Sequence, residues 1–304
     1  VSVKDGDNGT TFCISLTDAS TDKAVLAVDG SHANGTEIQI DNSATDGDAF
    51  LSFQLSGTSK FTMGVDDGDS DVFKIGTTAI GTGTMFVLDT SSNISLSNND
   101  GGTSNTILGK LAGDDLASGG NYNIFLGEDA GHTNKLGDNN IAIGYDAMDL
   151  SYIDDTQDAL TVDNIFIGKD AGGGDWATAA SHSNVGIGSG VMDAAMNGAQ
   201  KNVGVGYAAL GALTEGDKNI AIGYLAGAVL ASGTDNVFIG NGAGAASTDV
   251  DKAVIVGRRA NNAGNMTSDA DGTVGIGYDA LYSLTSGINN TAIGFQALDA
   301  AQTS

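Results

Sequence analysis

The sequence predicts an all-β protein in which a β-solenoid of eleven coils follows an antiparallel β-hairpin region. Two observations support this. First, the 304 residues include 46 glycines and no proline, whereas average usage would give about 15 prolines. Each proline deletes a hydrogen bond from a β ladder, so its absence is typical of a chain built from long ladders. Second, an internal repeat fills residues 98–304.

Nine of the eleven repeats start with Asn, the exceptions being Ala253 and Thr273, and each continues with a β-branched residue, a variable residue, an aliphatic residue and Gly. Clear copies are Asn140–Gly144, Asn219–Gly223 and Asn290–Gly294. An Ala follows three residues after the glycine in most copies, which suggests close packing between layers. The basic spacing is 17 residues, and the eleven repeat glycines are Gly109, Gly127, Gly144, Gly168, Gly188, Gly206, Gly223, Gly240, Gly257, Gly277 and Gly294.

The alternation within each repeat predicts one short strand per coil. A unit of 17 residues cannot bury its own apolar face, but stacking successive units does, and this is the logic of a solenoid. The glycine permits a left-handed bend after the strand. Stacked asparagines can bond to the backbone of the neighbouring turn. We interpret the two aliphatic residues that flank the middle of each strand as its core-facing side chains.

The middle residue of the strand is never polar in the eleven copies. We interpret it as pointing away from the solenoid core, where a solvated face would carry Ser, Thr, Lys or Asp. This predicts that the chain assembles with other copies of itself. The alternative is a monomeric solenoid with a neutral outer face. The candidate interface residues are Ile107, Phe125, Phe166, Phe238 and Ile255.

Residues 1–97 are interpreted as an antiparallel β-rich fibre or shaft region, and residues 98–304 as the repeat solenoid. Gly, Asp, Ser and Asn turns separate short alternating runs before residue 98, a pattern typical of hairpins. The runs are Thr10–Leu16, Ala24–Val28, Thr36–Ile40, Phe50–Leu55, Lys60–Val65, Val72–Ile75 and Met85–Leu88.

Charge and motif content favour a non-enzymatic protein without cofactor or metal. The formal net charge of −26 opposes binding to nucleic acid, because no basic patch offsets it. His32, His132 and His182 are isolated in the sequence and show no metal-ligand spacing. Gly186–Gly190 lacks the lysine of a phosphate-binding loop. A site that cleaves polysaccharide between chains is the remaining enzymatic alternative.

The repeated Asn-x-Ala-Ile-Gly phrase resembles the head repeats of YadA-like trimeric autotransporter adhesins. The variant Gly-Tyr-x-Ala-Leu at Gly277–Leu281, and its counterpart at Gly294–Leu298, is similar to tail-fibre proteins of aquatic bacteriophages. The resemblance implies parallel β-rolls packed as a homotrimer. It also implies a structural fibre of a virion that contacts a neighbouring virion protein and presents a surface for host attachment. The alternative is a bacterial surface adhesin or an extracellular filament subunit.

Three intervals, after Gly144, Gly168 and Gly257, exceed the basic spacing by three residues or more. Extra residues in solenoids loop out on one face, often the binding face. We therefore predict contact with a host glycan or protein at Tyr152, Trp176 and His182. The alternative for Trp176, the only tryptophan, is that it folds back over the solenoid edge.

Overall fold

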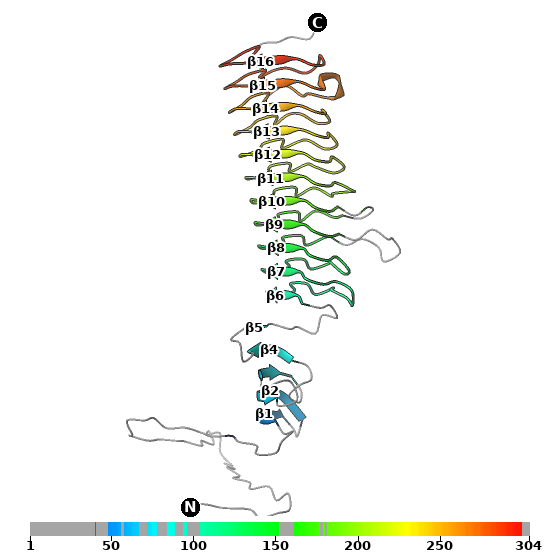
Figure 1. Ribbon diagram of the computed structural model, residues 1–304, viewed down its shortest axis with the longest axis vertical. Coiled ribbons are helices and arrows are strands. Elements are labelled where there is room, and N and C mark those ends of the chain that lie inside the picture. Colours follow the sequence, from blue (N-terminus) through cyan, green and yellow to red (C-terminus); the bar gives the residue numbers. More distant parts are fainter. Residues whose placement is uncertain are drawn as a thin grey trace, which may run out of the picture.

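The protein forms two β-sheets and has no α-helix among the residues that the structure describes. A computed structural model gives the arrangement (Figure 1). It describes residues 40, 48–55, 58–66, 72–77, 84–88, 94–95, 104–151, 161–176, 179 and 181–299. The runs predicted at Thr10–Leu16 and Ala24–Val28, and residues 36–39 of the third run, lie outside these ranges.

The first sheet is antiparallel and contains five strands in the order β1-β2-β3-β4-β5. It confirms the hairpin prediction for the four runs between Phe50 and Leu88. Lys74 Nζ and Asp66 Oδ2 form a buried ion pair at 2.7 Å between neighbouring strands. The strands are β1 (Ala49–Leu55), β2 (Thr58–Asp66), β3 (Val72–Gly76), β4 (Thr84–Leu88) and β5 (Ile94–Ser95).

The second sheet is the spine of the predicted solenoid. Eleven parallel strands of three residues follow one another in sequence order, one strand per coil, and the coils stack along the long axis of Figure 1. They are β6 (Thr106–Leu108), β7 (Ile124–Leu126), β8 (Ile141–Ile143), β9 (Ile165–Ile167), β10 (Val185–Ile187), β11 (Val203–Val205), β12 (Ile220–Ile222), β13 (Val237–Ile239), β14 (Val254–Val256), β15 (Val274–Ile276) and β16 (Thr291–Ile293). A 3₁₀ turn, η2 (Ser268–Ala270), lies in the long interval after Gly257.

The repeat glycine bends the chain directly after each strand, as predicted. Gly223 has a φ of +137°, and its N–H donates to the carbonyl of Val205 in the preceding coil at 2.8 Å. A Cβ at this position would lie 2.5 Å from the carbonyl oxygen of Gly240 in the next coil. Glycine therefore serves two purposes here, a positive φ and the close approach of successive coils.

The sequence interpretation of the strand faces was wrong. The middle residue of each strand points into the solenoid, and Phe125, Phe166 and Phe238 have no exposed surface in the single chain. Ile255 is equally buried and Ile107 is 8% exposed. These five residues therefore form the interior of the coils and cannot serve as the oligomer interface.

The size of the middle residue is matched to the residue six positions later, four after the glycine. Where the middle residue is Phe166 or Phe238, that position is Gly172 or Gly244, and a Cβ there would come within 3 Å of the ring. In four of the six coils with a small middle residue, a buried Met or Leu stands at that position; Met192, for instance, compensates for Gly186. Such alternation of large and small side chains is how a close-packed interior is filled.

A column of asparagines connects the coils inside the solenoid. Asn219 accepts a hydrogen bond on Oδ1 from the N–H of Asn236 at 3.1 Å and donates from Nδ2 to the carbonyl of Gly233 at 2.7 Å. Its own N–H donates to Oδ1 of Asn202 at 2.9 Å. The pattern confirms the prediction that asparagines bond to neighbouring turns. The members of this column are Asn105, Asn123, Asn140, Asn164, Asn184, Asn202, Asn219 and Asn236.

Replacing Gly223 with Val should destabilise the protein far more than the same change at Gly294. Both glycines have positive φ, at +137° and +132°, but only Gly223 has backbone within reach of a Cβ. We expect a loss of about 1–3 kcal/mol at Gly294 from backbone strain and above about 4 kcal/mol at Gly223. Urea unfolding of both variants measures this. Equal losses of unfolding free energy would show that the close approach of the coils adds nothing to the cost of the change at Gly223.

Replacing Asn219 with Ala should cost about 2–4 kcal/mol, because it leaves a buried N–H and a buried carbonyl without partners. Asn241 is an exposed asparagine outside the column, so Asn241→Ala is the matched control and should change stability by less than about 0.5 kcal/mol. Thermal unfolding of the two variants provides the comparison. Similar melting temperatures would contradict a stabilising role for the column.

Candidate interaction surface

The outward face of the parallel sheet is almost entirely aliphatic. The strands pair in register, so that Val203 lies beside Ile220 and Val205 beside Ile222. The first and third residues of the eleven strands therefore form two columns that run the length of the solenoid. We call these columns the outer face. It contains Ile, Val and Leu with two threonines and no charged residue: Thr106, Ile124, Ile141, Ile165, Val185, Val203, Ile220, Val237, Val254, Val274 and Thr291 in one column, and Leu108, Leu126, Ile143, Ile167, Ile187, Val205, Ile222, Ile239, Val256, Ile276 and Ile293 in the other.

The outer face is open in the single chain. Ile187, Ile220 and Ile222 are 41%, 38% and 40% exposed in the middle of the sheet. Eleven strands about 4.8 Å apart give a stripe about 50 Å long and on the order of 500–700 Å² in area. The largest apolar patch on a typical monomer is about 300–600 Å² and is often functional. A stripe of this size and composition is typical of a surface that another molecule covers.

The corner that follows the sheet carries aromatic and basic side chains. We call the residues directly after the repeat glycines the trailing edge. Tyr207 and Tyr224 stack there with ring centroids 5.3 Å apart, and both are about half exposed. Tyr278 and Phe295 stack in the same way. The trailing edge runs Lys110, Glu128, Tyr145, Lys169, Ser189, Tyr207, Tyr224, Asn241, Arg258, Tyr278 and Phe295.

The cations of the trailing edge have partners on their own chain. Lys169 lies over the Tyr145 ring, 5.7 Å from its centroid, and its ammonium bonds to the adjacent Asp170, which raises the pKa of Lys169. Arg258 lies 5.4 Å from the Tyr278 ring centroid. Lys110 pairs with Glu128 at 2.6 Å, and the hydrogen bond to that carboxylate raises the pKa of Lys110.

The corner that precedes the sheet has a different composition. We call the residues directly before the repeat asparagines, or before the residues that replace them, the leading edge. Lys201, Lys218 and Lys252 are exposed there, with Asp235 between the last two. None of these lysines forms an ion pair with any residue that the structure describes. The outer face therefore lies between an edge that carries three unpaired ammonium groups among mostly polar and acidic residues and an edge rich in aromatic rings.

The residues predicted to contact a host do not form one exposed surface among the described residues. Trp176 is fully buried and packs edge-on against Phe166, with ring centroids 5.7 Å apart. Its indole therefore fills the solenoid interior, and the predicted receptor contact at this residue was wrong. His182 is half-buried in the coil wall, where its ring meets Ser183 Oγ at 3.2 Å. Tyr152 lies outside the described residues.

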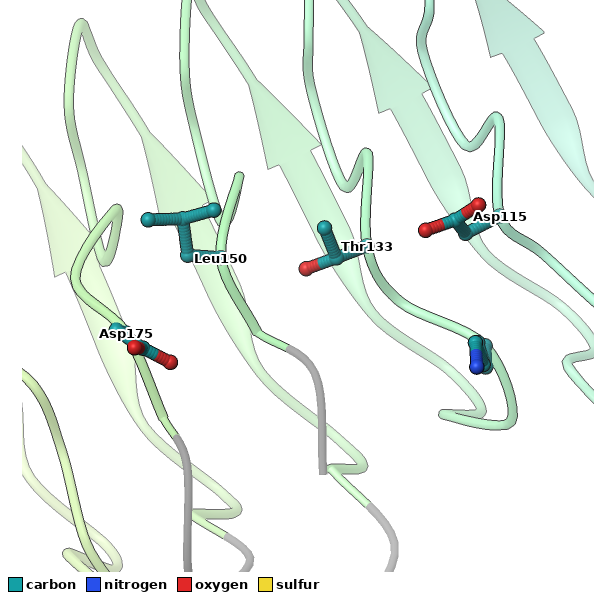
Figure 2. A pocket seen from close by; sticks show the side chains of 5 residues that line it. Asp115, Thr133, Leu150 and Asp175 are labelled. Atoms are coloured by element: carbon teal, nitrogen blue, oxygen red, sulfur yellow. The ribbon is translucent and has the colours of Figure 1, made fainter. Parts of the chain in front are cut away.

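A pocket of about 350 Å³ crosses the turns of the first four coils. Figure 2 shows Asp115, Thr133, Leu150 and Asp175 on successive turns along it, and Lys135 completes the lining. The Thr133 hydroxyl donates to the Asp149 carbonyl at 2.7 Å. The described lining thus offers scattered polar groups, and none of them is paired as a nucleophile with a base.

Comparison of the chain with protein-family models, with curated proteins and with solved structures found no match. Within the described ranges, no group of three His, Cys, Asp or Glu residues is placed to hold a metal ion. The same ranges contain no helix long and apolar enough to cross a membrane. The outer face is therefore the strongest candidate for a functional surface.

Trp176→Ala should lower the free energy of unfolding by about 3–5 kcal/mol, because it opens a cavity in the interior. Tyr122 is 61% exposed, and Tyr122→Ala should leave stability within about 0.5 kcal/mol of the unmodified chain. Chemical denaturation compares the two directly. A stable Trp176→Ala variant would restore the interpretation of this indole as a surface ligand contact.

Proposed function

We propose that the protein is a structural fibre subunit that assembles as a homotrimer through its outer face. The observation that carries this proposal is the aliphatic stripe along the whole solenoid, flanked by polar and aromatic edges. Water contact with such a stripe is unfavourable, and covering it contributes roughly 25 cal/mol for each Å² removed from water. Another copy of the chain offers a stripe of equal length and the same coil spacing.

The place of this fibre is a virion, where it acts as a tail fibre or appendage and presents a surface for host attachment. Its rod shape and the Gly-Tyr-x-Ala-Leu repeats support this proposal. Three parallel copies also place any attachment site in triplicate, which raises avidity through effective concentration. A bacterial surface adhesin or extracellular filament subunit is the second candidate, favoured by the resemblance of the Asn-x-Ala-Ile-Gly phrase to adhesin heads.

Labelled antibody imaging separates the two candidates. We expect the label on virion appendages, beside a neighbouring fibre or virion protein. Label confined to bacterial cell surfaces would instead support the adhesin. An enzymatic product released from host polysaccharide by the purified protein would contradict a purely structural role.

Ile222→Asp should dissociate the assembly without unfolding the chain. The side chain lies outside the coil, so the solenoid interior is unchanged, but an unpaired carboxylate would be buried between copies. A buried charge without a partner costs about 3–5 kcal/mol, which weakens association by about 100-fold or more. Ser232→Asp places the same charge on an exposed turn and should leave association unchanged.

Sedimentation at several concentrations measures the dissociation, and circular dichroism checks the fold. A variant Ile222→Asp that sediments like the unmodified oligomer would show that the outer face is not the contact surface.

A further inference from the structure

The two edges of the outer face carry complementary groups at the same height. Lys201 and Tyr207 flank β11, and Lys218 and Tyr224 flank β12. The lysines have no ion-pair partner among the described residues, and no described cation lies over either tyrosine ring. The stacked pair of Tyr207 and Tyr224 is thus a part of the trailing edge whose rings have no described cation of their own chain over them.

These groups cannot meet within one chain. Tyr207 lies six positions after Lys201, and an extended backbone rises about 3.3 Å per residue, so the two edges lie up to roughly 20 Å apart. The intervening strand also holds them on opposite sides of the outer face. Any contact between the two edges therefore has to join different copies.

We propose that Lys201 and Lys218 of one copy reach the free outer faces of the stacked rings of Tyr207 and Tyr224 of the next copy, a contact that rests on the proposed assembly through the outer face. Ammonium groups are attracted to the faces of aromatic rings, more strongly where water is excluded. Because each lysine and its tyrosine flank the same strand, the copies run parallel and at equal height. The contact is heterologous, and because it adds no shift in height between copies, a rotation of one third of a turn closes it into a ring of three.

An antiparallel pair lacks this complementarity. A twofold axis perpendicular to the solenoid would set leading edge against leading edge, and an axis between β11 and β12 would bring Lys201 of each copy against Lys218 of the other. Like charges placed opposite each other oppose association. Parallel copies instead set each leading edge against a trailing edge. The lysines and tyrosines therefore select the direction of neighbouring chains as well as their height.

Cysteine cross-linking of the full chain tests the proposal. Cys13→Ser first removes the only cysteine of the sequence. In that background we compare Lys218→Cys, Tyr224→Cys and the double variant, each treated with a short bifunctional maleimide. The double variant should give a covalent ladder on a denaturing gel that ends at three chains, and each single variant should remain at 30.4 kDa.

Cross-linked dimers from Lys218→Cys alone would overturn the proposal, because they require leading edges to meet. A double variant that is oligomeric but yields no cross-link would also overturn it, while leaving assembly through the outer face intact. A ladder ending at two chains would keep the edge contact and overturn the trimer. An unmodified chain that sediments only as a monomer overturns the assembly itself.

A charge exchange provides an independent check. Lys218→Tyr and Tyr224→Lys should each weaken association by about 10-fold, since one stacks rings without a cation and the other opposes two ammonium groups. The double exchange restores one lysine and one tyrosine at the same contact and should recover most of the affinity. Losses that simply add in the double variant would contradict direct contact.

Discussion

Everything in the solenoid depends on the in-register hydrogen bonding of one coil to the next at the repeat glycine. The N–H groups of Gly206, Gly223 and Gly240 each donate to the third strand residue of the preceding coil at 2.8 Å. Only a residue without Cβ allows the coils to approach so closely while turning with positive φ. Because the register repeats, equivalent residues form continuous columns. The asparagine column, the aromatic interior and the aliphatic outer face all follow from this one constraint.

Much of the fold was predictable because each repeated position has a strong local signal. The strands ending before Gly144, Gly223 and Gly294, the bends at those glycines and the stacking of asparagines all follow from backbone chemistry. The antiparallel runs from Phe50 to Leu88 were predictable from alternation and turn residues. These features depend on interactions between neighbouring residues or neighbouring coils, which the sequence displays directly.

The sequence interpretation failed where it had to decide which strand face points inward. Alternation along a strand shows which residues share a face, but it does not show which face points inward. Here both faces are apolar, so hydrophobicity does not decide between them. The decisive signal was the size match between Phe166 and Gly172 and between Gly186 and Met192, six residues apart. Such compensation requires both side chains to share one interior space. The prediction that Trp176 contacts a host failed for a related reason. Extra residues in a coil can fold back into the interior instead of extending into solvent.

Correcting the orientation strengthens the case for assembly. Packing within one chain accounts for both the small and the large residues at the middle positions of the strands. The β-branched residues beside them, such as Ile220 and Ile222, then remain exposed to water without a partner in the single chain. The chain carries a net charge of −26, yet its outer face has no charged residue. The acidic groups that the structure describes in the solenoid lie on turns and corners, where they do not oppose contact along the stripe.

The most direct test of this account is the mass of the unmodified full chain in mild buffer at micromolar concentration. Sedimentation equilibrium or native mass spectrometry should give three times the chain mass of 30.4 kDa, with the outer-face aliphatic residues protected from hydroxyl-radical labelling. A stable species at 30.4 kDa with Ile187, Ile220 and Ile222 freely labelled would contradict the central claim that other copies cover this face.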